Sequence, residues 1–164
     1  MIRFLTIFIF SNFLILNIAI AKNISLNSLV NFSKLNNFKD NRKSVKKNKE
    51  YSAYKGRDPW ILIQAYKGSD NFKQVALLCD QCTSKTLSKE HVKDCVQNFN
   101  LLYEHLAGEK YPNNLEEILN NPSPKINDLI NDKISKFKLR LSSGALKCDG
   151  RGGERLRIDF FVSK

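Results

Sequence analysis

The sequence lacks the short motifs by which many enzymes are identified. Its 164 residues contain no Gly-rich phosphate loop, no nucleophile elbow and no pair of carboxylates in a context that suits acid-base chemistry. Acidic residues are also few, with 16 Asp and Glu against 27 Lys and Arg, which gives a formal net charge of +11. These absences leave catalysis without positive support. The basic balance favours nucleic acid, an anionic membrane surface or acidic proteins as partners.

The first 21 residues predict a cleavable signal peptide. A single charge at Arg3 precedes a long apolar run from Phe4 to Ile20, and residues 19–21 have the small-x-small form of a signal-peptidase site. Cleavage is expected before Lys22. An uncleaved membrane anchor is the alternative, although polar residues interrupt the run. No later stretch is apolar enough to cross a membrane, so the mature chain is expected to have no transmembrane segment.

Residues 22–57 are predicted to form a disordered basic tail. They hold ten Lys and Arg against Asp40 and Glu50, and much of the remainder is Asn and Ser. Their apolar residues show no sustained period of 3.6 or 2, so the segment is not expected to bury enough surface to offset its ordering entropy. Much of the positive charge of the chain therefore belongs to this tail rather than to one binding face.

Together, the signal peptide and the basic tail resemble a known kind of leader. A signal peptide followed by a stretch rich in Lys, Asn and Ser resembles the two-part leader that carries proteins into the plastid of apicomplexan parasites, which implies an apicoplast-like stroma and removal of residues 22–57 as a transit peptide. Two glycosylation sequons, at Asn23 and Asn31, instead fit a secreted or luminal protein. Both locations are kept as hypotheses.

Residues 58–164 are expected to form a single globular domain with several helices. Capping residues and apolar spacing predict a helix from Asp58 to Gly68, for which a strand is the alternative, and a second helix that ends at Cys82. The clearest helix follows Ser88 and ends at Gly108. A short helix is expected at residues 115–119 and another amphipathic segment at residues 126–134.

Toward the C-terminus the apolar period changes from 3.6 to 2. Residues 137–141 and 156–160 alternate apolar with mostly charged side chains, and the glycine-rich stretch 149–153 between them suits a hairpin turn. The predicted fold is therefore α+β, a small helical domain of three to five helices with a C-terminal antiparallel hairpin or small sheet.

The four cysteines are the most informative candidate site residues. In an oxidising lumen their even number implies two disulfides among Cys79, Cys82, Cys95 and Cys148, with three possible connectivities. Cys79 and Cys82 would share one helical face, so each is expected to bond to another element. One of them could meet Cys95 on the next helix, and the other could reach Cys148 in the sheet.

In a reducing compartment the same residues suggest different chemistry. Cys79, Cys82, His91 and Cys95 form two pairs at metal-ligand spacing, and three thiolates with an imidazole would suit zinc. Buried, inert thiols are a further alternative. A redox dithiol at Cys79 and Cys82 is a weaker hypothesis, because such pairs usually lie at a helix N-terminus and this one is expected to end a helix.

A group of basic residues near the C-terminal strands is the best candidate for an anionic ligand. This basic rim consists of Lys138, Arg140, Lys147, Arg151, Arg155 and Arg157. A solvated strand face explains the same pattern. The leading functional hypothesis is a small non-catalytic binding or assembly protein whose partner is a protein, with nucleic acid or an anionic surface as further possibilities. The alternatives are a secreted, disulfide-stapled effector or surface protein, and a zinc or CxxC thiol protein.

Overall fold

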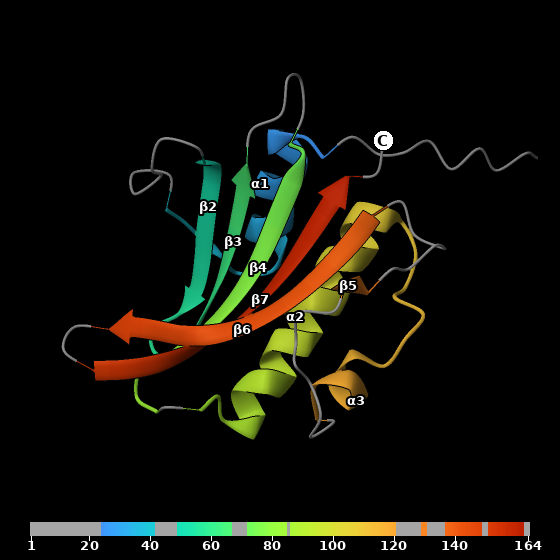
Figure 1. Cartoon of the computed structure of the whole chain (residues 1–164). Coiled ribbons are helices and arrows are strands. Elements are labelled where there is room, and N and C mark those ends of the chain that lie inside the picture. Colours follow the sequence, from blue (N-terminus) through green and yellow to red (C-terminus); the bar gives the residue numbers. More distant parts are fainter. Residues whose placement is uncertain are drawn as a thin grey trace, which may run out of the picture.

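The fold is one antiparallel sheet with helices on one of its faces. The computed structural model describes residues 24–41, 49–66, 72–84, 86–120, 129–130, 137–148 and 151–162. In these ranges the chain forms three helices and seven strands (Figure 1). The predicted signal peptide lies outside the described residues. None of the described helices is long and apolar enough to cross a membrane.

The sheet is built from five long strands and two very short ones. Its order is β1 (Lys39–Asp40), β2 (Lys49–Gly56), β3 (Trp60–Tyr66), β4 (Gln74–Gln81), β7 (Arg151–Val162), β6 (Phe137–Cys148) and β5 (Leu129–Ile130). Every neighbouring pair is antiparallel. After β4 the chain crosses behind the sheet through α2 and α3 and returns as the β6–β7 hairpin, with β7 beside β4 (Figure 1).

The α+β class is confirmed, but the sheet dominates and the domain is not mainly helical. The two segments predicted as helices, Asp58 to Gly68 and about Ser69 to Cys82, instead contain β3 and β4. In β4 every residue after Gln74 is buried, because both faces of this central strand are covered. A run that is apolar on both faces matches helical spacing as well as a strand pattern, which explains the error. In β3 the alternative prediction of a strand was right.

The strongest periodic patterns were predicted correctly. Helix α2 (Lys89–Ala107) begins after Ser88, whose side chain accepts a hydrogen bond from the His91 amide, and it ends at Gly108 in the left-handed conformation. Helix α3 (Leu115–Asn120) and the β6–β7 pairing also match the sequence pattern. Of the amphipathic segment expected at 126–134, the described part is the short strand β5.

The prediction of disorder is wrong for the described residues between 24 and 57. Helix α1 (Leu26–Leu35) begins after the capping residue Ser25 and buries Leu29 and Phe32 against the core. Strand β2 buries Tyr51 and Ala53 in the same core. Half of the ten residues of α1 are apolar, but they lie in an Asn- and Ser-rich stretch, and both elements are held by tertiary packing. The basic cluster at residues 42–48 lies outside the described residues.

The hydrophobic core fills the space between the sheet and helices α1 and α2. Aromatic rings occupy its centre: Phe99 of α2 stacks on Phe160 of β7 with ring centroids 5.5 Å apart, and Tyr111 meets Phe99 edge-on at 4.9 Å. No described helix lies on the opposite face of the sheet (Figure 1).

Candidate binding site on the outer face of the sheet

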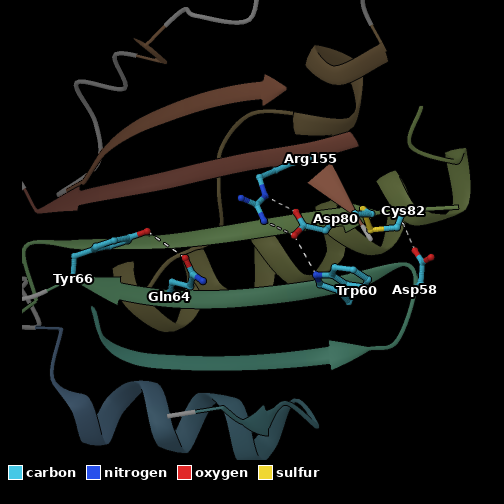
Figure 2. Close-up of polar contacts among 8 residues, drawn as sticks. Asp58, Trp60, Gln64, Tyr66, Asp80, Cys82 and Arg155 are labelled. Carbon is cyan, nitrogen blue, oxygen red and sulfur yellow. Dashed lines mark hydrogen bonds and ion pairs between the residues drawn. A yellow bond between two sulfur atoms is a disulfide. The ribbon is translucent and has the colours of Figure 1, made fainter. Parts of the chain in front are cut away.

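The outer face carries aromatic and arginine side chains in register. On β3, Ile61, Ile63 and Ala65 point into the core, while Trp60, Leu62, Gln64 and Tyr66 point to the other side and are partly exposed. Cross-strand pairing places Trp60 opposite Asp80 of β4, and Asp80 opposite Arg155 of β7. Figure 2 shows these three side chains next to one another on adjacent strands. The face therefore displays the residue types that dominate protein-binding surfaces.

Asp80 organises one end of this face. Its carboxylate is 1 % exposed and accepts hydrogen bonds from Arg155 Nε at 2.7 Å and Arg155 Nη2 at 2.6 Å. It also accepts one from the Trp60 indole nitrogen at 3.1 Å. A buried carboxylate needs such partners, and the two-pronged arginine contact fixes both side chains in place. The indole ring is consequently held at a fixed position on the outer face.

A second ion pair lies further along the same face. Arg157 donates to Asp159 at 2.9 Å and to the Tyr66 hydroxyl at 3.3 Å, and its guanidinium lies 5.6 Å from the centre of the Tyr66 ring. Gln74 completes the cluster by donating to Asp159 at 2.8 Å. Burial works against the charge on Arg157, but the hydrogen bond and charge of Asp159 outweigh it and raise the pKa of the guanidinium. Arg157 therefore stays protonated.

Two adjoining hollows occupy the outer face, and together they are called the outer-face groove here. The larger has a volume of about 650 Å³ and is lined by Asp58, Trp60, Leu62, Asp80, Cys82, Leu146, Lys147, Cys148 and Arg155. The smaller has a volume of about 480 Å³ and is lined by Asn41, Tyr54, Gly56, Arg57, Trp60 and Leu62. Trp60 and Leu62 line both, so they lie at the centre of the groove. Residues of β3 and of the distant strand β6 share one hollow because the hairpin bends across the face (Figure 1).

All four cysteines are joined in two disulfides. Cys79–Cys95 ties β4 to α2 in the core, with the Cα atoms 6.0 Å apart. Cys82–Cys148 ties the residue after β4 to the end of β6 with a Cα separation of 5.8 Å, and it lines the groove. Asp58 secures this corner further, since its carboxylate accepts the Cys82 amide at 2.9 Å (Figure 2). Disulfides of this kind form and persist in an oxidising compartment.

The expected disulfide partners are found, but on different elements from those predicted. Cys79 bonds to Cys95 and Cys82 to Cys148, yet both first members belong to the region of β4 rather than to a helix. Cys79 and Cys82 are not joined to each other, so the dithiol hypothesis does not fit this state of the protein. The zinc hypothesis does not fit it either, because every sulfur of Cys79, Cys82 and Cys95 is in a disulfide. No group of three or more His, Cys, Asp or Glu side chains gathers at one point among the described residues.

The basic rim lies on the two strands of the β6–β7 hairpin, and two of its members form ion pairs. Lys138 and Arg140 are exposed on β6, on the same face as Arg155 and Arg157, whose charges are offset by Asp80 and Asp159. Lys147 lines the groove next to Cys148. The side chain of Arg151 lies outside the described residues.

Sequence reasoning missed Trp60, Asp80 and Asp159 as site residues. Once β3 and β4 are known to be strands, alternation places Trp60 and Asp80 on the face opposite Ile61 and Cys79. Because both segments were predicted as helices, the position of Trp60 and Asp80 on one face of a sheet was not recognised.

Comparison of the chain with models of known protein families, with curated proteins and with solved structures found no match.

Proposed function

We propose that the protein is a non-catalytic binding protein of an oxidising compartment that captures an extended, acidic segment of a partner protein in the outer-face groove. The observation that carries the proposal is the composition of this groove, in which Trp60 and Leu62 lie at the centre, with Arg57 at one end and Lys147 at the other. Aromatic and arginine side chains contribute most of the energy at protein interfaces. The flanking cations select for negative charge.

The charge balance of the groove supports an acidic partner. Asp80 forms an ion pair with Arg155, so among the charged lining residues the Asp58 carboxylate stands alone against Arg57 and Lys147, and one positive charge is left in excess. The outer face also carries Lys138 and Arg140 on the adjacent strand. A partner that brings carboxylates to this surface gains attraction that weakens as salt is added.

Export or luminal residence is the location that fits this proposal best. Two disulfides favour an oxidising lumen over a reducing plastid stroma. Removal of residues 22–57 as a transit peptide would also take away α1 and β2, which contain Leu29, Phe32, Tyr51 and Ala53 of the core. The secreted, disulfide-stapled interaction protein is therefore preferred to the apicoplast-like hypothesis.

The fluorescence of Trp60, the only tryptophan, gives a direct test of the groove. Three peptides of equal length, one acidic, one neutral and one basic, are titrated into the folded protein. We expect saturable binding of the acidic peptide, with a dissociation constant on the order of micromolar that rises as salt is added. Equal affinity for all three, or none for the acidic one, would contradict the proposal. Tight binding of a single-stranded oligonucleotide instead would identify nucleic acid as the partner.

A matched pair of variants localises the binding. Leu62→Glu places a negative charge at the centre of the groove, while Leu101→Glu makes the same change on α2, where Leu101 is 39 % exposed. We expect the first variant to lose at least about tenfold in affinity for the acidic peptide, and the second to bind as the natural protein does. The circular dichroism spectrum of each variant confirms that the fold is retained.

A further inference from the structure

Three asparagines of the chain, Asn23, Asn31 and Asn121, stand two residues before a serine, which is the spacing of an N-glycosylation sequon. Proline follows Asn121, and a sequon with proline in the middle is not an acceptor. Asn23 lies outside the described residues, whereas Asn31 lies within α1. The structure therefore shows the surroundings of one acceptor, Asn31.

Helix α1 turns the Asn31 side chain toward solvent. The helix buries Leu29, Phe32 and Ser33 on its other side. Asn27 and Asn31 are both exposed, and residues four apart share one face of a helix. A bulky polar group attached to Asn31 therefore extends into water and displaces no packed side chain.

The Asn31 amide is also free to carry a substituent. Within the described part of the chain, its side chain has no hydrogen-bond partner. Asn36 and Asn98 differ, because their amide nitrogens donate to backbone carbonyls at 2.9 Å and 2.8 Å. A sugar on either of those nitrogens would disturb a hydrogen bond of the fold, whereas at Asn31 it replaces only contacts with water.

The serine of this sequon is hidden in the folded chain. Ser33 is 3 % exposed, and its Oγ atom is buried without a hydrogen bond. A buried hydroxyl that lacks a partner costs stability, so the fold gives no reason for serine rather than alanine at this position. Recognition of the sequon does give a reason, because the enzyme that attaches the sugar requires the hydroxyl. The enzyme can reach it only before α1 packs on the core.

The disulfides indicate a compartment that suits this modification. Cys79–Cys95 and Cys82–Cys148 are typical of proteins that fold in an oxidising lumen. N-linked sugars are attached in the lumen through which secreted proteins pass. The modification therefore shares its expected route with the proposed function, but it does not depend on the outer-face groove.

We propose that Asn31 carries an N-linked oligosaccharide that begins with N-acetylglucosamine and is attached before α1 packs. The donor is an oligosaccharide joined to a polyprenyl diphosphate. The Asn31 Nδ2 atom forms a bond to C1 of the first sugar, the bond between C1 and the diphosphate oxygen breaks, and one amide proton is released. Asn31 lines neither hollow of the outer-face groove, and α1 lies on the helical side of the sheet (Figure 1). The sugar therefore leaves the groove open.

Peptide mass spectrometry of the full chain, isolated from the cell that makes it, tests the proposal. An amidase that releases N-linked sugars converts a glycosylated asparagine into aspartate, and heavy-oxygen water labels the residue that was converted. We expect the label at residue 31. A label at residue 23 alone, or at neither residue, would overturn the proposal.

Variants expressed with residues 1–21 in place show what the attachment requires. Asn31→Gln removes the acceptor and Ser33→Ala removes the hydroxyl, and each is expected to lose the sugar at position 31 completely. Ser33→Ala deletes only a hydroxyl without a partner, so it keeps the test valid if the other variant fails to fold. Asn27→Gln is the matched control, since it makes the same change on the same exposed face outside a sequon. Sugar on residue 31 of the Ser33→Ala chain, or its loss from Asn27→Gln, would contradict the proposal.

Transfer in vitro tests the order of attachment and folding. A solubilised oligosaccharyltransferase and its lipid-linked donor are mixed with the sugar-free chain, either folded or reduced and unfolded. We expect transfer to the unfolded chain only, because Ser33 is buried in the folded one. Equal transfer to both would contradict attachment before packing. Asn31→Gln should bind the acidic peptide as the natural chain does, so this proposal and the proposed function can fail separately.

Discussion

On the outer face, the buried carboxylate of Asp80 holds the partly exposed ring of Trp60 in place. Asp80 is almost fully buried, yet its two oxygens accept three hydrogen bonds from Arg155 and Trp60. The pair adds little to stability by itself, because Arg155 is 36 % exposed at its side chain and solvent competes for its charge. Its main effect is to hold Trp60 in one orientation, which lowers the entropic cost of binding a partner.

Gly153 is expected to be required by the close approach of β7 to β4. A Cβ atom at this position would overlap the Gln81 carbonyl oxygen and would lie 2.9 Å from the Cys148 sulfur. Gly153→Ala should therefore reduce the free energy of unfolding by about 1 to 3 kcal/mol, measured by urea denaturation. Gly152→Ala is the matched control, since a Cβ there meets nothing within 4 Å. Equal stability of the two variants would show that the strands can shift apart at no cost.

His91 is expected to make stability depend on pH. Burial lowers the pKa of its imidazole below the usual 6.5, although the charges of Asp94, Asp80 and Asp58 and the bond to the Asp80 backbone act in the opposite direction. Between the folded and unfolded pKa values the unfolded chain binds more protons. The neutral ring therefore contributes stability above pH 6.5, and this contribution is lost as the pH falls through the folded pKa.

The measurement is urea denaturation of the natural protein and of His91→Asn between about pH 7 and pH 5. Asparagine can keep the hydrogen bond to the Asp80 carbonyl but does not titrate in this range. We expect the natural protein to lose more stability than the variant as the pH falls. Parallel curves would mean that His91 titrates alike in the folded and unfolded chain.

At the scale of elements, sequence patterns were reliable where one face of an element is exposed. Helix α2 has apolar residues at helical spacing, and β6 and β7 alternate apolar with charged residues at 137–141 and 156–160, so their period could be read from the sequence. Strand β4 is buried on both faces and has no such alternation. Helix α1 is amphipathic, with five apolar residues among its ten, but this helix and strand β2 lie in a basic, Asn-rich stretch. Packing against distant residues, which single-segment patterns do not contain, determines their structure.

The two disulfides join different pairs of elements and are expected to differ in reactivity. Cys79 and Cys95 are fully buried, whereas Cys82 and Cys148 are partly exposed at the edge of the groove. Mild reduction followed by alkylation and peptide mass spectrometry should label Cys82 and Cys148 first, because a reductant must reach the sulfur atoms. Initial labelling of Cys79 and Cys95 would contradict the burial described here.

At the scale of the whole molecule, the fold depends on residues that precede Asp58. A chain that starts at Asp58 lacks α1, β1 and β2, and with them the buried side chains of Leu29, Phe32, Tyr51 and Ala53. Loss of several large core residues exceeds the usual stability of a small domain, since each costs about 2 to 5 kcal/mol. We expect this chain to give a poorly dispersed amide spectrum, while a chain that starts at Lys22 gives a dispersed one. A folded chain from Asp58 would restore the transit-peptide hypothesis.

The candidate site was only partly accessible to sequence reasoning. The cysteines could be identified as disulfide candidates from their number alone, and Arg155 and Arg157 from their alternation with apolar residues. Trp60 and Asp80 became site residues only when β3 and β4 were placed side by side, with β7 beside β4. That pairing joins segments about 75 residues apart in the chain, such as Asp80 and Arg155, and no local pattern specifies it.

Site-specific photo-crosslinking in the cell that makes the protein shows which surface contacts the partner. A photoreactive amino acid replaces Leu62 at the centre of the groove or, in the control, Leu101 on α2. We expect a crosslink from position 62 to an acidic segment of one partner protein, identified by peptide mass spectrometry, and no such crosslink from position 101. Crosslinks to that partner from position 101 alone, or equally from both positions, would contradict the assignment of the outer face as the binding surface.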